Sequence, residues 1–215
     1  MNILLVRHGE TAWNREGRYQ GRTDIPLSDT GHAQVRALGD RLRAIPIAVA
    51  LASPLSRART TAEAILAGRT VTLELDAGLL EISHGGWEGQ LASDVERDHK
   101  EMFGVWRSAP GRDAPAGPDA ETLGDVEARA WPVLERLCTR LGPDDTGLIA
   151  AHDAVNRVLL CRILGLPLQQ VWKFRQAPAT LNVLSGRSIT ELQVVRLNDC
   201  EHSEPLLHAS QHRAL

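Results

Sequence analysis

Three short, largely apolar runs constrain the fold of this chain most strongly. They cover residues 2–6, 47–53 and 146–152. A continuous apolar run of this length is typical of a strand that is covered on both faces, as in a parallel sheet. The first run leads directly into Arg7 and His8. A buried strand that ends in a cation and an imidazole indicates that this end of the sheet carries chemistry.

Segments with helical periodicity separate the apolar runs, because apolar residues recur in them every three or four positions. A further strand is expected over 70–75, and two more are expected over 179–197 with a turn at Ser185 and Gly186. Strands that alternate with helices indicate βαβ units. We therefore expect an α/β fold with three layers, α/β/α, around a mainly parallel central sheet. The expected helices cover residues 26–42, 54–68, 122–142 and 154–166.

Residues 82–119 interrupt this alternation, since they are rich in Gly and Pro and show little regular pattern. A short helix is expected around 93–103. We interpret the stretch as a small cap-like insertion in a single domain that spans 1–198. The residues that follow, 199–215, are polar and are expected to form a C-terminal tail.

The overall composition excludes several classes of function. The formal net charge of −3 provides no basic surface for nucleic acid or for anionic lipid. No apolar run is long enough to span a bilayer, and Arg7 and His8 interrupt the pattern of a secretory signal. Cys138, Cys161 and Cys200 are too few and too scattered for a disulfide framework. We therefore expect a cytoplasmic protein that binds neither nucleic acid nor a membrane.

Five chemically active residues follow the expected strands at the same end. Ligands of open α/β sheets lie beyond the carboxyl ends of the strands. Each residue taken alone has a structural explanation, since a histidine at a strand end is commonly a hydrogen-bonding group and an arginine is commonly solvated. Five together make a shared site the better interpretation. They are Arg7, His8, Arg57, Glu81 and His152.

This set of residues suits the transfer of a phosphoryl group. Two arginines can form bidentate hydrogen bonds with an oxyanion such as phosphate. A neutral histidine is a competent nucleophile near neutral pH, and a carboxyl group can donate and accept a proton. The sequence has no HExxH motif, Cys/His ladder or Asp-rich loop, so we expect no metal and no cofactor. The arginines and histidines would supply the electrostatic stabilisation that Mg²⁺ supplies in other enzymes.

Four segments of the chain resemble the histidine phosphatase superfamily, whose fold is called phosphoglycerate mutase-like. VRHGETAWNREGRYQGRTDIPLSDTG resembles its opening motif, and SPLSRARTTAE resembles its second arginine motif. LLEISHGGWEG resembles its glutamate motif, and IAAHDAVNRVLL resembles its second histidine motif. The resemblance extends from about residue 3 to 165, loosens up to 185, is weak across 90–118 and is absent from the tail. It implies a phosphoglycerate mutase-like fold and, within the family, the small phosphatases.

The resemblance also implies a role for each matched residue. His8 would be the nucleophile that forms phosphohistidine, and the carbonyl group of Gly9 would fix its tautomer. Glu81 would protonate the leaving oxygen and then deprotonate the attacking water. The implied catalytic residues are His8, Glu81, His152, Arg7 and Arg57. The implied substrate-binding residues are Arg7, Asn14, Gln20, Gly21, Arg57 and His152.

Two further residues of the glutamate motif carry rings. We expect Trp87 to pack in the core or the cap rather than to stack on substrate. For His84, a place at the mouth of the pocket and a place on a solvated face are both consistent with the sequence.

One position departs from the family pattern. The family commonly has Gly-His-Gly at the second histidine, whereas this chain has Ala151, His152 and Asp153. A carboxylate close to a phosphoryl group repels it. Asp153 therefore points away, pairs with an arginine such as Arg157, or contacts a hydroxyl group of the substrate. The sequence leaves these three alternatives open.

We expect a metal-independent phosphomonoesterase that acts on a small phosphorylated metabolite. The glutamate motif and the segment GPDAETLGDVEAR resemble the small phosphatases more than the mutases. The first alternative is a cofactor-dependent phosphoglycerate mutase. A non-catalytic member that binds a phosphorylated ligand is less consistent with the sequence, because all five catalytic residues are present. The substrate and the oligomeric state stay open, with a homodimer through an edge strand or the long helix as one option.

Overall fold

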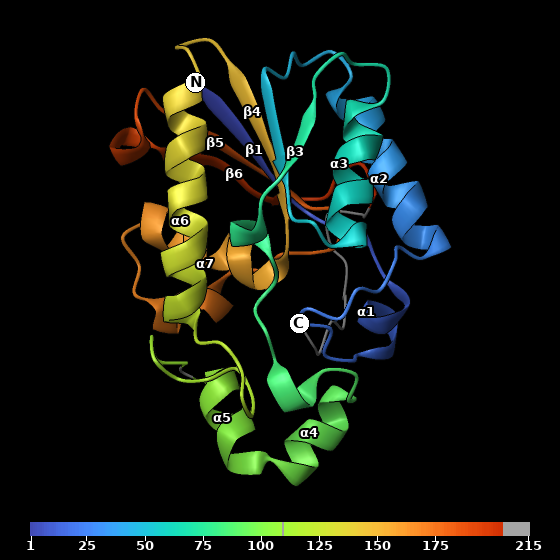
Figure 1. Cartoon of the computed structure of the whole chain (residues 1–215), viewed down its shortest axis with the longest axis vertical. Coiled ribbons are helices and arrows are strands. Elements are labelled where there is room, and N and C mark those ends of the chain that lie inside the picture. The colour runs from blue at the N-terminus through green and yellow to red at the C-terminus, as the bar shows by residue number, and fades with distance from the viewer. Residues whose placement is uncertain (109, 204–215) are drawn as a thin grey trace.

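The computed structural model describes residues 1–108 and 110–203 of the chain. Its central sheet contains β1 (Asn2–Arg7), β2 (Val49–Ala52), β3 (Leu73–Leu75), β4 (Thr146–Ala151), β5 (Leu181–Ser185) and β6 (Gln193–Asp199). The strand order is β3-β2-β4-β1-β5-β6 (Figure 1). β1 to β4 run parallel to one another, β5 pairs antiparallel with β1 at one edge, and β6 pairs antiparallel with β5. The prediction of a mainly parallel sheet is therefore confirmed.

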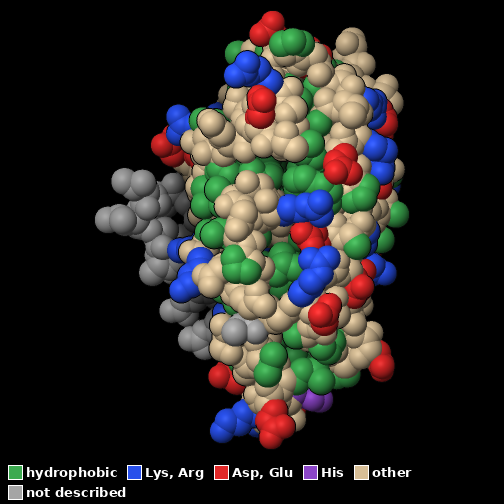
Figure 2. Space-filling model, turned by 90° about the vertical axis from the view of Figure 1, so that its left-hand side faces the viewer, with side chains coloured by type: hydrophobic (Ala, Val, Ile, Leu, Met, Phe, Trp, Pro, Cys, Tyr) green, Lys and Arg blue, Asp and Glu red, His purple; other side chains and the backbone are tan. Residues whose placement is uncertain are grey.

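Helices cover both faces of this sheet (Figure 1). α2 (Asp29–Leu42) and α3 (Ser56–Leu66) lie on one face, and α6 (Leu123–Arg140) and α7 (Asp153–Ile163) lie on the other. The three-layer α/β/α architecture is confirmed. On the face shown in Figure 2, Lys and Arg side chains are interspersed with Asp and Glu side chains. This mixture of signs agrees with the small net charge.

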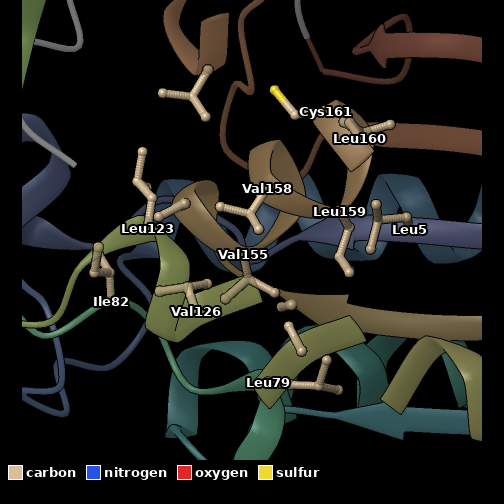
Figure 3. Close-up of a cluster of buried hydrophobic side chains, with 14 of the residues drawn as sticks. Leu5, Leu79, Ile82, Leu123, Val126, Val155, Val158, Leu159, Leu160 and Cys161 are labelled. Atoms are coloured by element: carbon tan, nitrogen blue, oxygen red, sulfur yellow. The ribbon is translucent and has the colours of Figure 1, made fainter. Parts of the chain in front are cut away.

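The apolar run of β1 is explained by these two layers. Successive side chains of a strand point to opposite faces of the sheet. Leu4 and Val6 pack in the core under α2 and α3, whereas Ile3 and Leu5 pack in the core under α6 and α7. Figure 3 shows Leu5 near Leu159 of α7 in the second of these cores. Because both faces are covered, the strand has no solvent-facing position until it ends.

The cap-like insertion lies at the end of the molecule opposite to the N-terminus (Figure 1). It contains a short 3-10 turn, η2 (Gly85–Trp87), followed by α4 (Ala92–Asp98) and α5 (Lys100–Ser108). The single helix expected around 93–103 is wrong. The chain leaves helical geometry at His99, whose φ is −125° and ψ is 38°, so two helices form instead of one.

The connection between β5 and β6 differs from the expected turn at Ser185 and Gly186. The chain forms a short 3-10 turn, η4 (Ile189–Glu191), before β6 begins. The terminal amino group of Met1 donates to the Gly186 carbonyl at 3.0 Å, and the Gly186 N–H donates to the Met1 carbonyl at 3.2 Å. These bonds hold Gly186 against the start of β1. The connection between β5 and β6 is therefore longer than a tight turn and includes η4.

The remaining bounds are close to the expected ones. β3 begins at Leu73, within the strand expected over 70–75, and α6 continues through Pro132 without interruption. β6 ends at Asp199, and 204–215 of the expected tail lie outside the described residues, so the division into a domain and a tail stays a prediction. In the described part of the chain, no helix is long and apolar enough to cross a membrane. The other short elements are α1 (Ala12–Glu16), η1 (Ala77–Leu79) and η3 (Leu168–Lys173).

Candidate active site

The register of two parallel strands brings His8 and His152 together. β1 and β4 are neighbours, and Arg7 at the end of β1 is paired with Ala151 at the end of β4. Each histidine is therefore the first residue beyond its strand. Their ring centroids lie 5.2 Å apart, with an interplanar angle of 59°. Both side chains are buried.

In the described part of the chain, one ring nitrogen of His8 has a hydrogen-bond partner and the other has none. His8 Nδ1 lies 2.7 Å from the carbonyl oxygen of Gly9, as expected. A carbonyl oxygen can only accept, so Nδ1 carries the hydrogen and Nε2 keeps its lone pair. Burial, followed by Arg57 and Arg7, lowers the pKa of His8 well below its usual value. The side chain is thus a neutral imidazole with an unprotonated Nε2, which is the form a nucleophile needs.

Gly9 is required where the backbone turns away from His8. A Cβ atom added at Gly9 would lie 2.8 Å from the carbonyl oxygen of Gly31 and 2.8 Å from Cγ1 of Val35. The first of these neighbours is backbone of α2 and cannot move easily. The close approach of α2 therefore explains why glycine follows the histidine.

The two predicted arginines are both buried and are held by backbone carbonyl groups. Arg57, in the first turn of α3, donates from Nη1 to Thr23 O at 2.9 Å and from Nη2 to Gly21 O at 2.7 Å. Arg7 donates from Nη1 to the carbonyl oxygen of Gln176. Burial lowers the pKa of Arg57 to about 10, so its guanidinium is still charged at neutral pH. Both guanidinium groups are fixed in orientation before any ligand binds.

Asn14 is positioned by a helix that the sequence analysis missed. Thr11 caps α1, and its N–H donates to Asn14 Oδ1 at 3.0 Å. This bond fixes the side-chain amide so that Nδ2 is free. Gln20 is also buried, and its Oε1 accepts from Thr11 Oγ1 at 2.8 Å. The capping pattern of Thr11 and Asn14 is the local signal from which α1 could have been predicted.

Several buried nitrogen atoms of these residues have no hydrogen-bond partner in the described part of the chain. A buried donor without a partner costs about 1–3 kcal/mol, so a group of them indicates a binding site. Guanidinium and amide nitrogens can only donate, which favours an anion with several oxygens. The atoms are Arg7 Nε, Asn14 Nδ2, Arg57 Nε, His152 Nδ1 and His152 Nε2.

Glu81 reaches the site from the segment after η1. Its Oε2 accepts from the N–H of Asp153 at 3.1 Å, and its Oε1 accepts from the N–H of Ile82 at 2.9 Å. Burial, and then the neighbouring Asp153, raise the pKa of Glu81, while the Ile82 N–H, Arg57 and Arg7 act in the opposite direction. A buried carboxyl group with a raised pKa can hold a proton near neutral pH and release it during a reaction.

The structure shows one of the three arrangements that the sequence allows for Asp153. Its Oδ1 lies 3.0 Å from Arg157 Nε, one helical turn further along α7. The same oxygen lies 3.6 Å from Arg7 Nη1. Pairing with arginine is therefore the observed arrangement, and both carboxylate and guanidinium are buried.

The cap contains a cluster of aromatic rings that the sequence analysis did not assemble. His84 packs against Tyr19 with ring centroids 4.6 Å apart and against Trp106 with centroids 5.7 Å apart. His84 is completely buried, so the expectation of a solvated face is wrong, and burial lowers its pKa to about 4. Its Nδ1 lies 2.8 Å from the carbonyl oxygen of Ala116. Trp87 is buried in the same cluster, as expected.

Within residues 1–108 and 110–203, no three His, Cys, Asp or Glu side chains are grouped so that they could hold a metal ion. The charged groups that the structure does bring together at the carboxyl edge of the sheet come from β1, α3, the segment before η2 and the start of α7. They are the residues that the motifs predicted.

Comparison with known proteins gives a consistent result. The family model described as "Histidine phosphatase superfamily (branch 1)" matches residues 3–200. The chain is 32% identical over 184 residues to Phosphoserine phosphatase 1 of Hydrogenobacter thermophilus, with 86% of each protein covered. It is 33% identical over 177 residues to 2,3-bisphosphoglycerate-dependent phosphoglycerate mutase 2 of Gloeobacter violaceus, covering 80% of this chain and 79% of the mutase.

A solved structure matches over nearly the whole molecule. Bacillus stearothermophilus YhfR superposes with a TM-score of 0.87 and 30% sequence identity, covering 94% of this chain and 99% of that one. Sequence and fold thus agree over the residues that form the sheet, its helices and the site. The chain belongs to the histidine phosphatase superfamily (branch 1) and is an enzyme with the phosphoglycerate mutase-like fold.

Proposed function

We propose that this enzyme hydrolyses small phosphorylated metabolites through a phosphohistidine on His8. The observation that carries the proposal is the group of nitrogens on Arg7, Asn14, Arg57 and His152 that have no partner among the described residues and lie beside the neutral His8 ring. Phosphate oxygens would accept from those nitrogens that carry a hydrogen, and the phosphorus atom would then face a nucleophile. Positive charge from the arginines balances the charge of the transferred group, as metal ions do in other phosphoryl transfers.

In the first step, the lone pair of His8 Nε2 attacks phosphorus and the bond from phosphorus to the leaving oxygen breaks. The leaving oxygen takes the proton of Glu81, so an alcohol departs and the Glu81 carboxylate is left. The hydrogen bond from His8 Nδ1 to Gly9 O stabilises the positive charge that develops on the ring.

In the second step, the Glu81 carboxylate takes a proton from water and the water oxygen attacks phosphorus. The phosphorus–nitrogen bond breaks, inorganic phosphate leaves, and His8 returns to its neutral form. Glu81 is protonated again. The two steps therefore need one carboxyl group that acts first as an acid and then as a base.

The substrate class is inferred from the relatives and from the charge of the site. One relative is named phosphoserine phosphatase, and another is named adenosylcobalamin/α-ribazole phosphatase. A phosphomonoester of a small alcohol fits both names. The alternative is a phosphoglycerate mutase, which the relatives named as mutases favour. A mutase would return the phosphoryl group to a second substrate oxygen instead of to water.

The experiment is a rapid-quench measurement of enzyme-bound phosphate with p-nitrophenyl phosphate as substrate. Acid-labile, base-stable phosphate should appear on His8 within the first turnover and should be absent in His8→Ala. His32→Ala, a partly exposed histidine of α2, is the matched control and should label normally. No acid-labile phosphate in the wild-type enzyme would contradict the proposal.

A second assay distinguishes the two candidate reactions. Release of inorganic phosphate from 3-phosphoglycerate and other phosphorylated metabolites, ranked by kcat/KM, supports a phosphatase. Formation of 2-phosphoglycerate that depends on a bisphosphoglycerate primer supports a mutase. We also propose a cytoplasmic location and a homodimer, which fractionation of cells and sedimentation of the purified protein would test.

A further inference from the structure

The carboxylate of Asp153 is buried in an environment where a negative charge is unfavourable unless neighbouring groups stabilise it. Asp153 is the first residue of α7 and directly follows His152. Its side chain is fully buried, and within the described part of the chain its Oδ2 has no hydrogen-bond partner. A buried carboxylate is retained only where charged neighbours stabilise it or where its charge acts on another group.

Arg157 holds this carboxylate in one orientation. Arg157 Nε donates to Asp153 Oδ1 at 3.0 Å, and its Nη1 donates to Val171 O at 2.7 Å and to the carbonyl oxygen of Phe174. Its guanidinium also lies over the ring of Trp172, 5.0 Å from the centroid. Arg157 is thus fixed at two points, with Nη1 bonded to backbone carbonyl groups and Nε bonded to Asp153.

The residue that carries this carboxylate also binds the carboxyl group of Glu81. The N–H of Asp153 donates to Glu81 Oε2 at 3.1 Å. Both residues are buried, and the negative charge of Asp153 raises the pKa of Glu81. Two neighbouring acidic groups in a buried site resist being ionised together. Arg157 and Arg7 lie at ion-pair distances from the carboxylate of Asp153, whereas the described hydrogen bonds to Glu81 come from backbone N–H groups.

We propose that Asp153 is a positioning residue whose fixed negative charge keeps the proton on Glu81 until the leaving oxygen takes it. The inference rests on the proposed function, because it assigns the proton donor of that reaction. It also explains why a carboxylate can stand next to a phosphate-binding histidine: Arg157 and Arg7 share its charge.

Other groups around Glu81 act in the opposite direction or are neutral. Arg7 from β1 and Arg57 from α3 favour the ionised carboxylate. Arg129 from α6 donates to the main-chain carbonyl of Glu81 at 3.1 Å. Burial lowers the pKa of His8 and that of His152 well below the usual value, so both rings are neutral. Among these groups, Asp153 from α7 is the one whose charge favours the acid form.

Asp153→Asn tests the inference, because it removes the charge and nearly preserves the shape. The rate of phosphohistidine formation is measured against pH with the best alkyl phosphate among phosphoserine, glycerol 2-phosphate and glucose 6-phosphate. The basic limb of this profile should move to lower pH by roughly one unit, the lower end of what a neighbouring like charge produces. Above that limb the variant should be about tenfold slower. With p-nitrophenyl phosphate, which hardly needs a proton donor, the shift should be small.

Two controls separate this role from a structural one. Asp29 is the first residue of α2, as Asp153 is of α7, but it is exposed. Asp29→Asn should therefore leave the pH profile of phosphohistidine formation unchanged. In a Glu81→Gln background, Asp153→Asn should produce no further shift of the basic limb, because the group that titrates is gone. If Asp153→Asn acted only by disturbing the structure, its loss of rate would also appear in the Glu81→Gln background.

A measurement on the wild-type enzyme covers the case in which Asp153→Asn does not fold. An infrared difference spectrum between wild type and Glu81→Gln at pH 7 should contain the C=O stretch of a protonated carboxylic acid. An ionised Glu81 in that spectrum, or coincident pH profiles for wild type and Asp153→Asn, would overturn the inference while phosphohistidine still formed. Absence of phosphohistidine in the wild type would instead overturn the proposed function.

Discussion

His8 and His152 lie with their ring centroids 5.2 Å apart, although they are far apart in the sequence. Their strands pair in parallel, and Arg7 and Ala151 occupy matching positions at the strand ends. A slip of one residue in this register would turn one ring to the other face of the sheet. The geometry of the candidate site therefore depends on the pairing of β1 with β4 rather than on any local motif.

Replacement of the nucleophile gives the first prediction. His8→Ala should lower kcat by several orders of magnitude, because no other group in the proposed mechanism can carry the phosphoryl group. The check is steady-state turnover of p-nitrophenyl phosphate, with His32→Ala as the control. A residual activity above about one hundredth, the level left by the loss of a general acid or base, would contradict covalent catalysis by His8.

The second prediction concerns the buried guanidinium of Arg57. Arg57→Lys keeps a positive charge but loses the fork that binds Gly21 O and Thr23 O, so inorganic phosphate and vanadate should inhibit at least about tenfold more weakly. Arg59→Lys is the matched control, because Arg59 is about half exposed and pairs only loosely with Glu63 at 3.6 Å. Equal inhibition constants for the two variants would exclude Arg57 from the anion site.

Phosphate should also stabilise the fold without any metal. A ligand that binds only the native state at one hundred times its Kd raises the free energy of unfolding by about 2.7 kcal/mol. The thermal unfolding midpoint of the wild type should therefore rise with phosphate, and the rise should persist after dialysis against EDTA. Turnover should be unchanged by EDTA as well. A loss of activity that Mg²⁺ or Zn²⁺ restores would contradict the electrostatic role given to the arginines.

Glu81→Gln separates proton donation from the rest of catalysis. An alkoxide leaving group needs a proton as its bond to phosphorus breaks, whereas p-nitrophenolate hardly does. Formation of phosphohistidine should slow by roughly 10²–10⁴-fold for an alkyl phosphate and far less for p-nitrophenyl phosphate. Because Glu81 also serves the attack by water, steady-state turnover of p-nitrophenyl phosphate should fall after an initial burst. Equal losses of phosphorylation rate on both substrates would show that Glu81 is not the donor.

The buried histidines make stability depend on pH. Burial lowers the pKa of His84 to about 4, so the folded state stays neutral while the unfolded chain takes up a proton below pH 6.5. The contribution of His84 to the free energy of unfolding is therefore fully present above pH 6.5. It is lost as the pH falls towards 4, by up to about 1.4 kcal/mol per pH unit. The check is the free energy of unfolding, measured by urea at several pH values between 4.5 and 7.5. Its dependence on pH should be weaker for His84→Phe than for the wild type, and unchanged for His32→Phe.

Much of the site could be predicted from the sequence, because its residues follow segments that can be identified as buried strands. Continuous apolar runs identify buried strands, and the residues just beyond them must lie at one edge of a parallel sheet. The residues that follow expected strands and are grouped by that argument are Arg7, His8, Arg57, Glu81 and His152. The motifs then imply a role for each of them, and the structure brings these residues to the same edge of the sheet.

What the sequence leaves open depends on contacts between distant segments. The i,i+4 spacing of Asp153 and Arg157 makes their pairing one of the expected alternatives. The approach of Asp153 to Arg7, the burial of His84 against Tyr19, and the division of the cap helix at His99 have no local signature. Each is decided by which side chains the packed chain places within a few ångströms, since charge pairing and desolvation act only at that range. The apolar pattern and the motifs of the sequence determined the layers and the identity of the chemical groups, and tertiary packing decided their charge states.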